Sequence, residues 1–302
     1  MKLLRKTFLL FSIIMLIGCS ENLQEKGSPK YVTEIKEWHS KRIENLVKEN
    51  GWLNLAGLFW LKEGENKFGS DKSNDLIFPE DKSPKFMGSF ILKDSIVILK
   101  VNSSVEVFLD NCEEVKEMEL KHDQQKGTTI LDHGSLRWNL IKRGDRYGIR
   151  LRDLDAELVK NFPGIDTYPV NEDWRLEAEF EPYNPPKEIE IPTVIGTIEK
   201  EKSPGSLVFK KDGNQYRLDV TDSGNSYFVI FADQTNGKET YGAGRFLSVN
   251  KADSTGKIYI DFNKAYNPPC AFTKFATCPL PPKQNYLKLE VTAGEKNFGK
   301  GH

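Results

Sequence analysis

Alternation of apolar and polar residues dominates the chain from about residue 88 onward, and this pattern predicts β-strands. Residues 136–141 and 147–151 alternate on either side of the turn Arg143-Gly144-Asp145, as expected for a hairpin. A second series of strand-like segments runs from residue 193 to residue 291. The chain is therefore predicted to be mainly β, with two sandwich- or barrel-like units, an N-terminal helix and few other helices.

One long helix is predicted before the β-rich part of the chain. Apolar residues recur at helical spacing from Pro29 to Asn50, with Ser28 placed as the N-cap and Pro29 in the first turn. Asn50-Gly51 is a typical helix stop. Because one face of this helix is apolar, we expect it to pack against the body of the protein.

Prolines mark the expected boundary between the two β units. Residues 182–192 contain four prolines together with several charged residues, which is typical of a linker. We therefore expect the helix and the first β unit to occupy residues 30–185. The C-terminal β unit is expected over residues 186–302. The alternative is one continuous β body that is interrupted at residues 182–192.

The first 19 residues resemble a bacterial lipoprotein signal peptide. A basic start is followed by an apolar segment too short to span a bilayer, and then by Leu16-Ile17-Gly18-Cys19, which resembles a lipobox. Cys19 would carry the lipid, including palmitate, and residues 20–29 would form a tether. This predicts an exported protein held in the bacterial cell envelope, on the periplasmic side or at the outer membrane, by its lipid alone. An ordinary secretory leader or an N-terminal anchor is the alternative.

Composition and charge exclude several classes of protein. The 302 residues include 43 basic and 44 acidic side chains, and 38% of them are hydrophobic, as in ordinary globular domains. Loss of the basic leader would make the mature chain more acidic. Since no basic stripe interleaved with aromatic residues occurs, a nucleic-acid partner is not expected.

The polar side chains of the proline-rich stretch from Tyr241 to Asn285 are the candidate site. Prolines stiffen this segment, and rigid loops that hold polar groups are where sites are commonly built. A structural cap on one end of a barrel is the alternative use of such a loop. The candidate ligand-binding residues are Arg245, Asp261, Asn263, Tyr266, Asn267, Cys270 and Asn285.

Arg245 has two interpretations. In the functional one, its guanidinium anchors a ligand carboxylate or phosphate, while Gly242 and Gly244 let backbone N–H groups approach the anion. In the structural one, Arg245 pairs with Asp261 and cross-links two strands. A guanidinium left partly free in a concave pocket would favour the first interpretation, and full enclosure would favour the second.

The cysteines also leave two interpretations open. Cys270 and Cys278 are close enough in sequence to form a disulfide, which an exported protein could acquire, and Cys112 would then be left over. Alternatively, Cys270 is a nucleophile that needs His122 or His133 to arrive from the first β unit.

Other candidate chemistry in the chain is weaker. Asp233 and Glu239 could act as an acid–base pair only if the fold brings them together. His122-Asp123 and Asp132-His133 read as solvated turns, and two cysteines eight residues apart without a local histidine do not form a zinc site. No metal or other cofactor is therefore predicted, and whether the protein is an enzyme stays open.

Several motifs together resemble a known family. They are Gly57 to Gly64, Arg150-Leu151-Arg152-Asp153, Phe231 to Gly237, Thr240 to Leu247, Asp261-Phe262-Asn263, Ala265 to Phe272, Cys278 to Pro282, Asn285, and Ala293 to Lys296. They resemble the bacterial and archaeal family called domain of unknown function 1684, from about residue 31 onward. The resemblance implies no established activity. It implies that the family signature includes Arg245, Asp261, Asn267, Cys270, Cys278 and Asn285.

The function expected from the sequence is the binding of a small anionic ligand at a C-terminal site, with catalysis left open. The alternative is a non-catalytic module of the cell envelope that binds a protein or a glycan. In that case the proline-rich loop would serve as a structural clamp.

Overall fold

The computed structural model describes residues 23–110 and 112–299. The predicted signal peptide, its lipobox and Cys19 lie outside the described residues. Within the described part, no helix combines the length and apolar character needed to cross a membrane.

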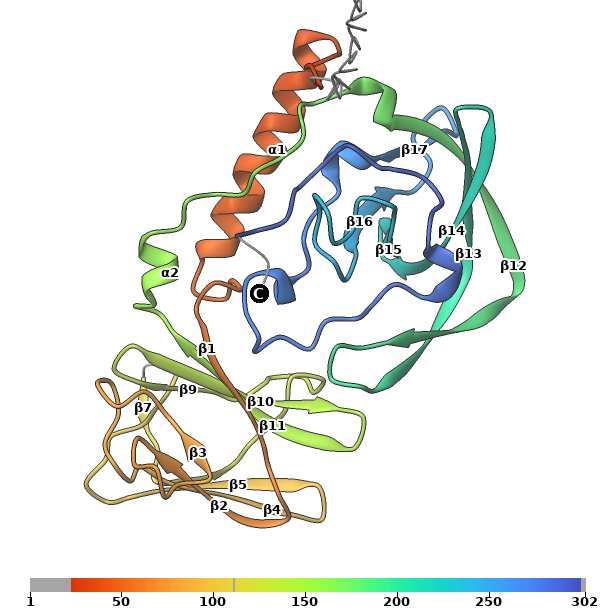
Figure 1. Ribbon diagram of the computed structural model, residues 1–302. Coiled ribbons are helices and arrows are strands. Elements are labelled where there is room, and N and C mark those ends of the chain that lie inside the picture. Colours follow the sequence, from red (N-terminus) through yellow and green to blue (C-terminus); the bar gives the residue numbers. More distant parts are fainter. Residues whose placement is uncertain (1–22, 111, 300–302) are drawn as a thin grey trace, which may run out of the picture.

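The long N-terminal helix forms as the sequence predicts. Helix α1 (Pro29–Val47) begins after Ser28, whose hydroxyl accepts a hydrogen bond from the Tyr31 amide at 3.3 Å. It ends three residues before the predicted stop and buries one face that includes Ile35 and Leu46. Figure 1 shows α1 running alongside the second β unit and ending close to the first.

The first β unit is a sandwich of two sheets, in the strand orders β1-β11-β10-β9-β6-β7 and β3-β2-β4-β5-β8. Its core surrounds Trp138, which contacts Phe68 and Phe78 edge to face. The strands are β1 (Leu55–Trp60), β2 (Gly64–Gly69), β3 (Leu76–Ile77), β4 (Gly88–Lys93), β5 (Ile96–Val101), β6 (Phe108–Leu109), β7 (Glu113–Glu114), β8 (Glu117–Glu119), β9 (Ile130–His133), β10 (Leu136–Arg143) and β11 (Arg146–Asp153).

The second β unit is a six-stranded, nearly closed barrel in the order β16-β15-β14-β13-β12-β17. Phe262 lies at the centre of its core, against Phe209 and Phe231. The strands are β12 (Arg175–Pro192), β13 (Ile198–Lys211), β14 (Asn214–Ser223), β15 (Ser226–Phe231), β16 (Arg245–Asn250) and β17 (Ile258–Asp261).

Apart from α1, the described helices are single turns. They are α2 (Glu157–Lys160), η1 (Glu172–Trp174), η2 (Phe262–Lys264), η3 (Pro269–Ala271) and η4 (Lys283–Asn285). The prediction of a mainly β protein with an N-terminal helix and few other helices is confirmed.

The predicted linker at residues 182–192 is wrong, because these residues belong to β12. This strand pairs with β13 along most of its length and crosses the expected boundary after residue 185. Its register with β13 shifts between Pro182 and Lys187, so the central prolines fall where the hydrogen-bond ladder is interrupted. On the other side, pairing with β17 ends at Ala178, and the prolines therefore lie on a free edge.

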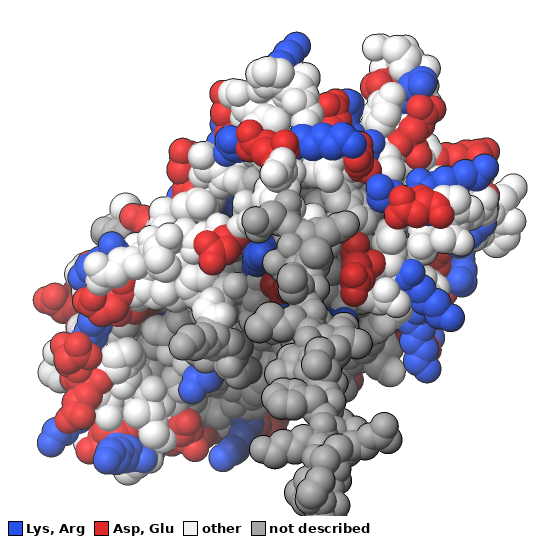
Figure 2. Space-filling view, turned by 45° about the horizontal axis from the view of Figure 1, so that its top comes forward, with Lys and Arg blue, Asp and Glu red and all other residues white. Residues whose placement is uncertain are grey.

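The two β units meet through apolar side chains from both. Leu55 of the first unit packs with Ile189, Phe246 and Cys278 of the second, and Trp52 lies against this cluster. The proline-rich segment after β17 thus lies at the junction of the two units rather than at a free end of the barrel. On the face shown in Figure 2, lysines and arginines are interspersed with acidic residues, without a broad field of one sign.

Candidate functional site

Arg245 does not form the predicted anion anchor, because its guanidinium is fully enclosed. Its side chain is 0% exposed and pairs at 2.9 Å with Asp233, not with Asp261 as the structural interpretation expected. The same group donates to the backbone carbonyls of Val291, Ala293 and Glu295. A buried charge with a counterion and this many acceptors cross-links the fold and is unavailable to a ligand.

The neighbouring glycine also has a packing role. Gly244 adopts φ +92°, and a Cβ there would lie 2.6 Å from the Phe231 carbonyl and 2.5 Å from a ring carbon of Pro281. Close approach of strand and loop therefore requires this glycine. An anion bound by its backbone is not needed to explain it.

Asp261 and Asn263 tie the barrel to α1. Asp261 accepts a hydrogen bond from the Tyr31 hydroxyl at 2.9 Å, and Asn263 donates to the same hydroxyl at 3.0 Å. Asn263 also exchanges two hydrogen bonds with the backbone of Asn171. Since burial is the largest influence on it, the pKa of Asp261 is raised, although Asn263 and Tyr31 favour its carboxylate.

The remaining predicted polar residues make separate structural contacts. The Asn267 amide donates to the Glu295 carboxylate at 2.7 Å, and the Asn267 carbonyl accepts from Arg42 of α1, which also lies over the Tyr266 ring. The side chain of Asn285 bridges two adjacent strands. Its oxygen accepts from the Asp219 amide, and its nitrogen donates to the carbonyls of Asp219 and Ile230. The predicted set therefore does not surround one opening.

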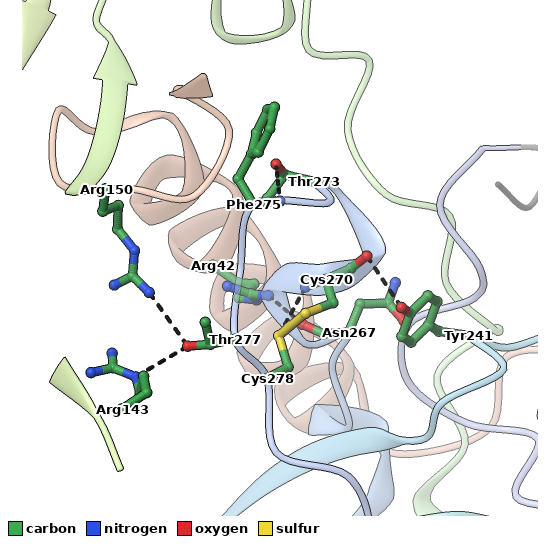
Figure 3. The surroundings of a disulfide bond; sticks show 10 residues. All are labelled: Arg42, Arg143, Arg150, Tyr241, Asn267, Cys270, Thr273, Phe275, Thr277 and Cys278. Carbon is green, nitrogen blue, oxygen red and sulfur yellow. Dashed lines mark hydrogen bonds between the residues drawn. A yellow bond between two sulfur atoms is a disulfide. The ribbon is translucent and has the colours of Figure 1, made fainter. Parts of the chain in front are cut away.

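Cys270 and Cys278 form a disulfide that closes a loop at the junction of the two units. Their Cα atoms are 6.1 Å apart, and the Cys270 amide donates to the Cys278 sulfur. As a disulfide, Cys270 offers no thiolate nucleophile. In the loop that the bond closes, Thr277 accepts hydrogen bonds from Arg143 and Arg150 of the first unit (Figure 3).

The other sequence hypotheses gain no geometric support. Asp233 is committed to Arg245, whereas Glu239 lies 3.6 Å from Lys296, so the two do not form an acid–base pair. His122 directly precedes a turn and accepts a hydrogen bond from the Gln124 amide, and His133 ends strand β9, where its ring contacts the Glu106 carbonyl. Among the described residues, no group of three or more His, Cys, Asp or Glu side chains is placed to hold a metal ion.

The cleft that remains is formed where the two units meet. It encloses about 710 Å³ between the outer face of the first unit's larger sheet and the barrel. Trp52, Phe228 and Phe246 give it an aromatic side, and Ala276, Thr277 and Cys278 come from the disulfide loop. Two guanidinium groups, those of Arg143 and Arg150, form its polar side together with Asp123 and Gln124.

The alternation of the first unit's strands places these arginines in the cleft. Ile149 and Leu151 point into the sandwich core, so Arg150 points out of the opposite face of β11. In most sandwiches that face meets solvent, but here the second unit covers it and leaves Arg150 only 6% exposed. Arg143 lies at the end of the adjacent strand β10.

Both guanidinium groups converge on one neutral oxygen. Arg143 and Arg150 donate to the Thr277 hydroxyl at 3.2 and 3.4 Å (Figure 3). Arg143 has a carboxylate partner, Asp123, at 2.8 Å. Within the described part of the chain, no carboxylate lies in salt-bridge range of Arg150, and its buried Nε has no hydrogen-bond partner.

The surroundings of Arg150 disfavour its charge. Burial, followed by repulsion from Arg143, lowers the pKa of Arg150 to about 10, against only partial compensation from Asp123. Arg150 is still cationic at neutral pH. The Trp52 ring lies beside it, with the ring centroid 5.6 Å from the guanidinium carbon. A cation held in this way has strong unused capacity to bind an anion.

The opposite rim of the cleft is acidic. Glu199, Lys200 and Glu201 line it from β13, and Lys200 is paired with Glu188 at 2.9 Å. The rim therefore repels additional negative charge, while the inner end at Arg150 attracts it. This polarity suits a ligand with one anionic group better than a polyanion.

Sequence reasoning missed Arg150, although the signal was present. Arg150 and Arg152 alternate with Ile149 and Leu151 in a segment recognised as a strand, so two arginines had to share its non-core face. What the sequence could not reveal is that the second unit covers this face. Burial by that unit makes Arg150 unusual.

A larger hollow, of about 1130 Å³, lies on the barrel and is a weaker candidate. Two of its lysines are paired locally, since Lys257 lies 2.8 Å from Glu177 and Lys251 lies 2.7 Å from Asp222. Because exposed pairs of this kind leave no buried charge without a counterion, they give no reason to expect a charged ligand in the hollow.

Residues 160–296 match the family described as "Protein of unknown function (DUF1684)". The match includes the disulfide loop and the barrel, whereas the motifs at residues 57–64 and 150–153 lie outside it. No curated protein matches the chain.

Two solved structures are similar to parts of the chain. The chain is 29% identical to an uncharacterised protein of Haloarcula marismortui solved by NMR, over 45% of this chain and 78% of that one, with a TM-score of 0.38. It is 16% identical to the FhaA FHA domain solved in complex with the intracellular domain of Rv3910, over 32% of this chain and 97% of that one, with a TM-score of 0.22. Similarity at these TM-scores supports no functional argument.

Proposed function

We propose, for a chain whose residues 160–296 form a DUF1684 domain, that the cleft between its two β units binds a small organic acid. The observation that carries this proposal is the convergence of Arg143 and Arg150 on the Thr277 hydroxyl, with Arg150 buried and lacking a carboxylate partner among the described residues. A ligand carboxylate would supply the missing counter-charge.

The shape and polarity of the cleft describe the rest of the ligand. Trp52, Phe228 and Phe246 offer an apolar surface beside the guanidinium groups, which suits an aryl or alkyl body attached to the carboxylate. The acidic rim at Glu199 and Glu201 disfavours a second anionic group. The expected ligand is therefore a monocarboxylate with a compact apolar body.

This proposal moves the anion site away from the position expected in the sequence. The C-terminal segment still takes part, because Thr277 and Cys278 belong to the disulfide loop that lines the cleft. The charged partner comes from β11 of the first unit instead of from Arg245. The proposal concerns binding of the ligand.

Benzoate and its neutral analogue benzamide are suitable probes. We expect calorimetry to detect benzoate binding to the wild-type protein, and to find benzamide at least tenfold weaker because it cannot neutralise Arg150. Arg150→Met should abolish benzoate binding. The matched control is Arg146→Met, which removes the same charge from the exposed start of β11, where Arg146 lies over Trp60 outside the cleft.

Equal binding of benzoate to the two variants would contradict the proposal. Equal binding of benzoate and benzamide to the wild-type protein would do so as well, because the apolar wall alone would then account for affinity.

We also propose that the protein is exported and held in the cell envelope by a lipid on Cys19. The support is the order of charge, apolar segment and lipobox in residues 1–19. Metabolic labelling with a palmitate analogue should mark the wild-type protein and not Cys19→Ala. Labelling of both would contradict this assignment.

A further inference from the structure

A second basic pocket lies on the same outer face of the first unit's larger sheet. It encloses about 580 Å³ and is lined by Arg137, Asn139 and Arg152, with Lys48 and Glu49 from the chain that follows α1. Cross-strand pairing places Arg152 opposite Arg137 and Arg150 opposite Asn139. Arg152 of this pocket therefore lies two residues along β11 from Arg150 of the cleft.

Trp52 connects the two places. Its ring lies 5.6 Å from the guanidinium carbon of Arg150 and 5.9 Å from that of Arg152. Arg150 lines only the inter-unit cleft, whereas Arg152 lines only this second pocket. The two pockets thus present separate guanidinium groups, both in contact with one indole.

Arg152 has donors to spare. Its Nη1 donates to the Gly51 carbonyl and to Asn54 Oδ1, which fixes the side chain without neutralising it. For the described residues, no hydrogen bond to its Nε or Nη2 and no carboxylate in salt-bridge range is found. Burial, followed by repulsion from Arg137, lowers the pKa of Arg152 to about 10, as expected for a cation without a counterion.

We propose that this pocket is a second anion site that takes an oxyanion such as a phosphate group, with Glu49 as its internal competitor. The lining carries three cations, Lys48, Arg137 and Arg152, against the carboxylate of Glu49, while the buried carboxylate of Asp132 pairs with Arg137. This balance is the reverse of the acidic rim of the inter-unit cleft, so the second pocket favours a higher anionic charge.

Glu49 is placed to compete with such an anion. Its carboxylate lies 2.7 Å from Arg137 Nη1, and its side chain is 72% exposed. Arg137 also has a buried partner, Asp132, at 2.6 Å, and does not need Glu49 to be neutralised. An incoming phosphate can therefore displace Glu49 from Arg137 at little cost, since exposed ion pairs are weak.

Titration with inorganic phosphate tests the site, with binding measured by calorimetry at constant ionic strength. Glu49→Gln removes the competitor and should bind phosphate about two- to fivefold more tightly than the wild-type protein. The matched control is Glu44→Gln, an exposed residue of α1 that loses the same charge without contacting Arg137. We expect its phosphate affinity to change by less than the Glu49 variant's.

A second measurement separates this proposal from the proposed function. Phosphate binding should persist in Arg150→Met, because the second pocket uses Arg152 and not Arg150. Absence of phosphate binding in both the wild-type protein and Glu49→Gln would overturn the second site. Equal tightening by the two glutamate variants, or loss of phosphate binding in Arg150→Met, would overturn it as well.

Discussion

Two buried arginines lie in opposite electrostatic surroundings. Arg245, in the barrel, is sealed from solvent and is matched by the Asp233 carboxylate and three carbonyl groups. Arg150, between the units, has one long hydrogen bond to the neutral Thr277 hydroxyl and a second cation, Arg143, beside it. Each leaves its Nε without a partner, so the difference lies in the counter-charge.

This difference separates a structural arginine from a binding arginine. A compensated buried charge holds its neighbours in place, and removing it strands the partner charge. An uncompensated buried charge weakens the fold, and a protein that keeps one gains something other than stability from it. Burial alone therefore does not identify a structural role.

Arg245→Met should have the largest effect on folding. It would leave the buried Asp233 carboxylate without its cation and remove four hydrogen bonds, at an expected loss of about 3–5 kcal/mol in unfolding free energy. Denaturant unfolding followed by circular dichroism would measure this. A loss below about 1 kcal/mol, in the range of ordinary surface changes, would break the comparison.

Reduction of the Cys270–Cys278 bond should have the next largest effect. Releasing a loop of this length is expected to lower the unfolding free energy by about 2–3 kcal/mol by the chain-entropy account. Because the same loop carries Thr277, benzoate binding should weaken in parallel. Cys112→Ala is the matched control, because it removes a cysteine outside the disulfide. If the wild-type protein and Cys112→Ala each bind benzoate with the same affinity before and after reduction, the loop has no role in the cleft.

Arg150→Met should shift stability in the opposite direction from Arg245→Met. Replacing an unmatched buried cation by an apolar side chain is expected to raise the unfolding free energy by about 1–3 kcal/mol, while benzoate binding is lost. The decisive result is the combination of a higher unfolding free energy and the loss of benzoate binding in the same variant. A destabilised variant would place Arg150 in the same class as Arg245.

The titration of Glu295, which lies beside Arg245, should have the smallest of these effects on stability. Burial is the main influence and raises the pKa of Glu295, although Arg42, the Asn267 amide and Arg245 oppose it. The folded protein therefore retains this proton more firmly than the unfolded chain does. The stability that the Glu295 proton contributes is complete below pH 4.5, the ordinary pKa of a glutamate. It is lost as the pH rises through the raised pKa of Glu295 in the folded protein.

Comparison of the wild-type protein with Glu295→Gln at a series of pH values tests this. The stability of the wild-type protein relative to the variant should fall as pH increases above 4.5. Curves that stay parallel across this range would show that Glu295 titrates alike in both states.

Local patterns in the sequence were sufficient for part of the fold. The cap at Ser28, the helical spacing after it and the hairpin alternation of β10 and β11 depend on neighbouring residues, and the structure bears them out. Residues 182–192 were misread, because prolines on a free strand edge and in a register gap resemble prolines in a linker.

The site could not be predicted to the same extent, since it depends on contacts between distant residues. The sequence offered Asp261 as the partner of Arg245, but the segment that follows β15 brings Asp233 there, and Asp261 accepts a hydrogen bond from Tyr31 of α1. Arg150 was visible as a polar residue on a strand face. Its isolation became apparent only when the second unit was seen to cover that face.

The most direct test of the central claim observes the Arg150 side chain itself. In a nitrogen-15-labelled protein, the Nε–Hε resonance of Arg150, assigned by its absence in Arg150→Met, is followed during titration with benzoate and then with benzamide. We predict that benzoate shifts this resonance in a saturable manner and that the resonance of Arg245 does not move. A resonance that stays in place with benzoate, or moves equally with benzamide, would contradict the claim that Arg150 is held unpaired for an anion.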